Sequence, residues 1–79
     1  MTIKILGSGC SNCKKLQANA KEAIGKANVD AEIIKVEDIK DIMAYGVMRT
    51  PAIVINEKVK AFGKVLTSDQ IKKLIEEEI

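Results

Sequence analysis

The sequence contains no histidine and no tryptophan, and several other residue types are scarce. Its 79 residues include two cysteines, one proline and only two aromatic side chains, Tyr45 and Phe62. Without histidine, the chain lacks the commonest general base and the commonest metal ligand. Any chemistry must therefore come from cysteine, carboxylate, lysine or backbone groups.

A concentrated charge of one sign is also missing. Thirteen lysine and arginine residues stand against eleven acids, which gives a formal net charge of +2. Nucleic-acid-binding proteins usually combine a clustered basic surface with aromatic platforms, and neither is visible here. The longest apolar run, Ala52 to Ile55, is far shorter than the ~20 residues that span a membrane. We therefore expect no nucleic-acid partner and no membrane association. Because no signal peptide precedes the first strand, we expect a cytoplasmic protein, and because nothing in the sequence supports dimerisation, we expect a monomer.

What the chain does contain is a globular composition and clear periodicity. The residues are 47% hydrophobic and 30% charged, which suits one small domain, 1–79, with a modest core. Period-two and helical patterns predict the order β-α-β-α-β-β-α. The predicted strands are 2–6, 31–36, 52–55 and 58–62, and the helices begin near Ser11, Ile39 and Ser68. Because the first two strands flank a helix, they should be parallel, and the last two should form a hairpin, so we expect an α/β fold around a four-stranded mixed sheet.

The last helix has the clearest start signal. Thr67 and Gln70 have the spacing of a capping box, and Leu66 and Ile71 have that of a hydrophobic staple. The acidic run 76–78 near the end of this helix is interpreted as a solvated face.

The cysteines Cys10 and Cys13 are separated by two residues at a strand-to-helix junction. Two cysteines are too few for a disulfide-stapled secreted domain, so this pair indicates catalysis or metal binding. Cys10 lies at the helix start, where free N–H groups and the helix dipole favour a thiolate. Cys13 follows one turn later, within the Cα separation of about 4.4–6.8 Å that a disulfide needs. This arrangement suits an exchange in which Cys10 attacks a substrate disulfide and Cys13 resolves the mixed disulfide.

The only proline, Pro51, opens the third strand about forty residues after this motif. Cys-x-x-Cys at a βα junction followed by such an X-Pro pair closely resembles the thioredoxin superfamily. The stretches 45–51 and 63–70 look like the thioredoxin segments that lead into its cis-proline and its last helix. The resemblance spans essentially the whole chain and is closest to small, glutaredoxin-sized thioredoxin-like proteins. It implies the thioredoxin-like fold without the extra N-terminal strand and helix of full-length thioredoxins.

The resemblance also implies roles for individual residues. Cys10 would be the nucleophile, Cys13 the resolving thiol, and the two would form a redox-active disulfide. Pro51, expected to be cis, would keep a backbone N–H out of the site, and the Thr50 backbone would pair with the substrate chain. The implied partners are a disulfide-containing protein and an upstream disulfide reductase, without a cofactor or bound metal. The implied substrate groove comprises Ser11, Asn12, Thr50, Pro51 and Gly63.

The chain departs from the family pattern in three places. Ser11-Asn12 replaces the Gly-Pro of thioredoxin and the Pro-Tyr of glutaredoxin, and Gly9 replaces the tryptophan before the thioredoxin motif. The buried acid of the first strand has no counterpart, since the nearest charged residue is Lys4, which we interpret as a surface residue. Proton transfer at Cys13 is therefore expected to rely on water, with Lys4 as a weaker candidate.

Two metal-binding alternatives remain open. The loop 7–13 also resembles that of copper chaperones, in which two soft thiolates bind Cu(I). Against this, the chaperone fold ends in a strand, and its methionine two residues before the first cysteine is Ser8 here. Alternatively, the pair could supply half of a zinc or iron–sulfur site shared across a homodimer.

Three further side chains, Met43, Tyr45 and Met48, could form an apolar lip for a partner. Such residues more often belong to the core.

Overall fold

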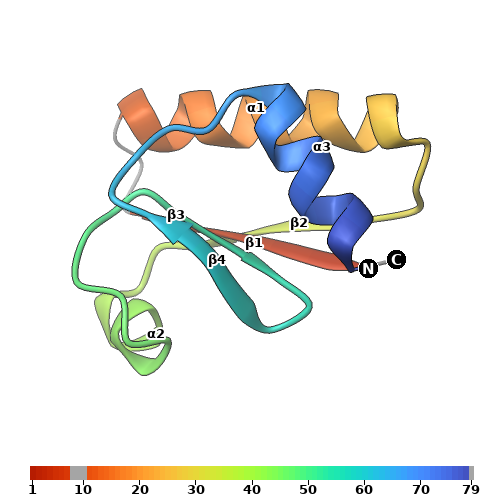
Figure 1. Cartoon of the computed structure of the whole chain (residues 1–79). Coiled ribbons are helices and arrows are strands. Elements are labelled where there is room, and N and C mark those ends of the chain that lie inside the picture. The colour runs from red at the N-terminus through yellow and green to blue at the C-terminus, as the bar shows by residue number, and fades with distance from the viewer. Residues whose placement is uncertain (8–10, 79) are drawn as a thin grey trace.

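The computed structural model describes residues 1–7 and 11–78 (Figure 1). The elements follow the predicted order, and the second strand begins one residue later than predicted. They are β1 (Thr2–Leu6), α1 (Ser11–Ala27), β2 (Glu32–Val36), α2 (Ile39–Ala44), β3 (Ala52–Ile55), β4 (Lys58–Phe62) and α3 (Ser68–Glu77).

The four strands form one mixed sheet in the order β2-β1-β3-β4. β1 and β2 are parallel, from Thr2 opposite Glu32 to Leu6 opposite Val36. β3 is antiparallel to both β1 and β4, and a register shift interrupts the second pairing between Ile53 and Val54. The expectation of a thioredoxin-like α/β fold is confirmed.

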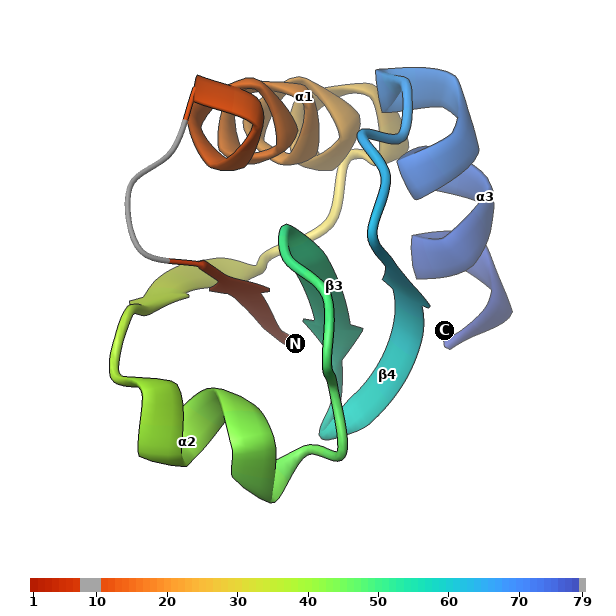
Figure 2. The same ribbon diagram turned by 90° about the vertical axis from the view of Figure 1, so that its left-hand side faces the viewer.

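The helices are divided between the two faces of the sheet. α1 and α3 lie side by side on one face, and α2 lies on the other (Figures 1 and 2). Alternation along β1 directs Ile3 and Ile5 to the first face and Leu6 to the second. Each face therefore has its own apolar cluster. The cluster under α1 and α3 contains Ile3, Ile5, Leu16, Ala20, Ala23, Ile53, Ile55, Leu66, Ile71 and Ile75. The cluster under α2 contains Leu6, Ile42, Val47, Ala52 and Val54.

Side-chain caps begin two of the helices. The capping box of α3 is confirmed: Thr67 Oγ1 accepts from the Gln70 N–H at 3.2 Å, and Gln70 Oε1 accepts from the Thr67 N–H at 3.0 Å. At α2, Asp38 Oδ1 accepts from the Lys40 N–H at 2.8 Å. Each cap satisfies N–H groups that have no partner within the helix.

The interpretation of the acidic run as a solvated face is wrong for Glu78. Its side chain is only 10% exposed, with oxygens 2.9 Å from Lys60 Nζ and 3.2 Å from Lys58 Nζ. The hydrogen bond from Lys60, followed by that from Lys58, lowers the pKa of the Glu78 carboxyl. The end of α3 packs beside β4, so helical periodicity alone could not reveal that this acid faces two strand lysines.

Of the two alternatives for Met43 and Met48, the structure excludes the core. Their exposed fractions are 67% and 95%, whereas Tyr45 is partly buried and packs against the α2-side cluster. α2 has only six residues, and Ile42 is its one buried residue.

Candidate functional site

Cys13 lies in the first turn of α1 and faces the sheet. It is 5% exposed and shares the buried helix face with Leu16, Ala20 and Ala23. Ser11 and Asn12 precede it at the exposed start of the helix. Cys10, the expected nucleophile, lies outside the described residues, and so does the sulfur that it would contribute to a disulfide with Cys13.

Gly7 packs directly against Cys13. A Cβ built on Gly7 would overlap Cys13 Sγ, and it would lie 3.6 Å from Thr50 Cβ. The Gly7 N–H also donates to the Val36 carbonyl at 2.9 Å, which extends the β1–β2 pairing to this residue. The close approach of Cys13 to the end of β1 therefore requires a glycine at position 7.

The loop before β3 completes this end of the sheet. The Thr50–Pro51 peptide bond is cis, and Pro51 is buried while Thr50 is exposed. The Pro51 carbonyl accepts from the Gly63 N–H at 2.9 Å. Gly63 has a φ of +72°, and a Cβ built on it would lie 3.3 Å from Arg49 Cβ, so the conformation and the packing both favour glycine. Fold and local pairing thus bring residues 7, 13, 50, 51 and 63 to one end of the molecule.

A small cavity of about 30 Å³ lies beside Cys13. That volume is enough for one water molecule. Its polar lining comprises Lys14, Gln17, Lys35 and Glu37. The first two follow Cys13 on α1. The β1–β2 register explains the position of the other two, because Lys35 pairs with Ile5 and Glu37 lies two residues further along the strand direction.

Sequence reasoning missed Lys35 and Glu37; for proton transfer at Cys13 it considered water and Lys4. In the structure Lys4 faces the α2 side, where its Nζ lies 2.7 Å from Glu57 Oε1 and donates to Tyr45 Oη at 2.7 Å. The hydrogen bond to Glu57, and then that to Tyr45, raises the pKa of Lys4, and the same bond from Lys4 lowers the pKa of Glu57. The signal that could have identified Lys35 was the parallel register, which follows from the βαβ order.

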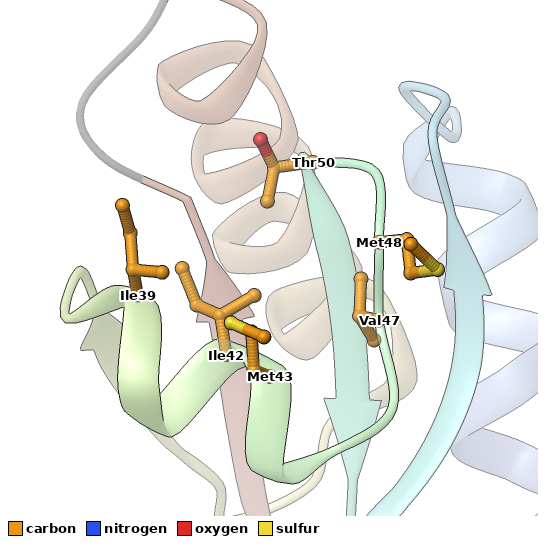
Figure 3. Close-up of a pocket in the computed structure, with 6 residues that line it drawn as sticks. All are labelled: Ile39, Ile42, Met43, Val47, Met48 and Thr50. Carbon is orange, nitrogen blue, oxygen red and sulfur yellow. The ribbon is translucent and has the colours of Figure 1, made fainter.

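A second, larger pocket opens on the α2 side of the same loop (Figure 3). It has a volume of about 350 Å³, and all but one of its lining side chains are apolar. The exception is Thr50, whose side chain therefore lies between this pocket and the Gly7–Cys13 contact. The full lining comprises Ile39, Ile42, Met43, Val47, Met48 and Thr50.

Within residues 1–7 and 11–78, no group of three or more cysteine, aspartate or glutamate side chains is arranged to hold a metal ion. In the same part of the chain, no helix has the length and apolar character needed to cross a bilayer.

The order of elements and the buried cysteine at the start of α1 are typical of a thioredoxin-like α/β protein. A family model described as a thioredoxin domain matches residues 1–76. The thioredoxin of Methanothermobacter thermautotrophicus is 35% identical over 75 residues, which cover 95% of this chain and 97% of that protein. The thioredoxin of Methanocaldococcus jannaschii is 33% identical over 73 residues, which cover 92% of this chain and 84% of that protein. The chain belongs to the thioredoxin family and is a thioredoxin-like redox protein.

These relatives give no support to the copper-chaperone alternative.

Proposed function

We propose that this protein is a thiol–disulfide oxidoreductase that reduces protein disulfides through Cys10 and Cys13. The observation that carries the proposal is the position of Cys13, which is buried at the start of α1 against Gly7 and close to the Thr50–Pro51 loop. The relatives named thioredoxin support the same class of chemistry.

In the first step, Cys10 attacks a sulfur of the substrate disulfide. Its place in the sequence immediately before Ser11, where α1 begins, favours the thiolate through the N–H groups and dipole of the helix end. The substrate S–S bond breaks, a Cys10–substrate disulfide forms, and the other substrate sulfur leaves as a thiolate that takes up a proton.

In the second step, Cys13 loses its proton and attacks Cys10. The Cys10–Cys13 disulfide forms, and the second substrate thiolate is released. The cavity beside Cys13 supports a path for the proton, since a water there would lie between the thiol, Lys35 and Glu37. We assign Glu37 as the proton acceptor and Lys35 as the positive charge that stabilises the Cys13 thiolate.

The substrate polypeptide lies across the Thr50–Pro51 loop. The Thr50 backbone pairs with it as an added strand, and Pro51 offers no N–H to compete at the sulfurs. Ser11, Asn12 and Gly63 border this path. The pocket beyond Thr50 receives an apolar side chain of the substrate, because its lining is almost entirely aliphatic and thioether. The disulfide formed in each cycle is reduced by an upstream disulfide reductase, and the protein works as a cytoplasmic monomer.

Single cysteine substitutions test these roles. Cys13→Ser should accumulate a stable mixed disulfide with a reducible protein such as insulin, because the resolving thiol is gone. Cys10→Ser is the matched control and should accumulate little. Non-reducing electrophoresis and intact mass measure both adducts. If Cys10→Ser accumulates as much adduct as Cys13→Ser or more, the assignment of the two roles is wrong.

A redox titration separates exchange chemistry from metal binding. In defined thiol–disulfide buffers, alkylation and mass readout should show one two-electron couple, within roughly −180 to −270 mV. Failure to form an intramolecular disulfide at any buffer reduction potential would overturn the oxidoreductase proposal.

A further inference from the structure

Two of the three methionines of the chain line the apolar pocket beside Thr50. Met48 is 95% exposed and Met43 is 67% exposed, and both border the same opening as Ile39 and Val47 (Figure 3). The third, Met1, is partly buried and packs against the larger core cluster. The two most accessible thioethers therefore lie at one surface, next to the redox site.

Exposed thioethers react with peroxides. The O–O bond of hydrogen peroxide breaks, one oxygen bonds to the methionine sulfur, and the other leaves as water. The sulfur loses two electrons and becomes a sulfoxide. Exposure controls access to this reaction, so Met48 and Met43 should react well before Met1.

We propose that Met43 and Met48 form a peroxide-sensitive modification site that controls the docking of protein substrates. The inference rests on the proposed function, because it takes the pocket as the place where an apolar substrate side chain binds. A sulfoxide is polar and accepts hydrogen bonds strongly. Burying it against an apolar side chain has an uncompensated desolvation cost. Oxidation thus converts an adaptable apolar lining into one that disfavours the substrate.

The fold tolerates this modification. Neither methionine belongs to the buried clusters on the two faces of the sheet, so the added oxygen removes little packing. The site of thiol chemistry is also spared, since the methionines lie beyond Thr50 from Cys13 and line a different cavity. Modification should therefore weaken substrate binding while leaving the exchange chemistry intact.

The test begins with the full chain, its cysteines blocked reversibly as methyl disulfides. The protein is treated with hydrogen peroxide, the cysteines are released with dithiothreitol, and peptide mass spectrometry locates each 16 Da addition. Rates are then measured with insulin, a protein disulfide, and with 2-hydroxyethyl disulfide, a small polar one. We expect sulfoxide at positions 43 and 48 before position 1. The insulin rate should fall about tenfold, with the small-disulfide rate unchanged.

The double variant Met43→Leu/Met48→Leu is the matched control, because leucine preserves the apolar volume and cannot be oxidised. It should keep its insulin rate after peroxide, whereas Met43→Gln/Met48→Gln should show the reduced rate without peroxide. Equal oxidation of Met1, an unchanged insulin rate after oxidation, or equal loss in the leucine variant would each overturn the proposal. If the untreated protein reduces neither disulfide, the proposed function itself has failed, and the mass data still report whether the two sulfurs react selectively.

Discussion

The two faces of the sheet are covered to very different extents. On one face, α1 and α3 enclose a cluster in which Leu16, Ile53 and Ile71 are fully buried. On the other, α2 spans only about 9 Å, because each of its six residues adds about 1.5 Å. A five-residue strand is about 17 Å long. The described large hydrophobic residues that remain exposed belong to this side: Ile34, Ile39, Met43, Met48, Val59 and Phe62.

This difference in coverage indicates that the two faces contribute differently to the structure. The covered face provides the packing around Cys13, and the open face leaves apolar surface exposed next to Thr50. The candidate site lies where the two meet, at the end of β1, since Gly7 approaches both Cys13 and Thr50.

The largest expected effect is a truncation on the covered face. Leu16→Ala should lower the free energy of unfolding by about 2–5 kcal/mol, because it leaves a cavity among residues that cannot collapse around it. The matched substitution on the open face, Met48→Ala, should stay within about 0.5 kcal/mol. Urea unfolding followed by circular dichroism measures both. Similar losses for the two variants would contradict the contrast between the faces.

The glycine at the junction of the faces should be the next most sensitive position. Gly7→Ala forces a methyl group into Cys13 Sγ and should cost about 1–3 kcal/mol. Gly25→Ala is the control, because a Cβ on Gly25 meets nothing within 4 Å and alanine is favoured in a helix by about 0.5–1 kcal/mol. The two variants should therefore shift the urea midpoint in opposite directions, and a stabilising Gly7→Ala would refute the close approach.

Removing the cap of one helix on each face should test the same contrast between the faces with a smaller effect. Thr67→Ala removes the capping box of α3 and should cost about 1 kcal/mol. Asp38→Ala removes the cap of α2 and should cost less, about 0.5 kcal/mol, because only Ile42 of that helix is buried. Thermal and urea unfolding of both variants test the order. A larger loss at Asp38 would mean that α2 contributes more stability than its burial indicates.

The smallest expected effects on the free energy of unfolding come from one ion pair on each face of the sheet. The pKa values of Glu78 and Glu57 are lowered by Lys60 and Lys4 respectively. Their stabilisation is therefore complete above the unfolded carboxyl pKa of about 4.3 and is lost as pH falls through the lower folded value. Glu57 is 64% exposed and Glu78 10%, so salt should screen the Glu57 pair more. The free energy of unfolding of the parent protein, Glu78→Gln and Glu57→Gln, measured at several pH values and salt concentrations, gives the contribution of each ion pair. An equal response of the two pairs to salt would contradict the expected difference in screening.

Local signals in the sequence were sufficient to predict the helices and strands and part of the candidate site. The Thr67–Gln70 capping box and the change of period after Gly7 place helices correctly, since both depend on neighbours a few residues apart. The properties that were mispredicted depend on distant partners. Glu78 is largely covered because the end of α3 lies beside Lys58 and Lys60.

Dependence on distant partners also decides which parts of the candidate site could be predicted from the sequence. The Cys-x-x-Cys spacing could be read directly from the sequence, whereas the position of Lys35 and Glu37 beside Cys13 depends on which strand lies beside β1 and in what register. The exposure of Met48 follows from the shortness of α2, which a pattern of apolar residues does not reveal.

The strand order has a consequence for the synthesis of the chain. β1 leaves the ribosome before the other three strands of this sheet, yet it occupies an interior position between β2 and β3. The unit of residues 2–36 can pair β1 with β2 early, but one edge of β1 stays open until residues 52–55 are made. During that interval the nascent chain presents an unpaired apolar edge, the kind of surface that recruits chaperones or other strands.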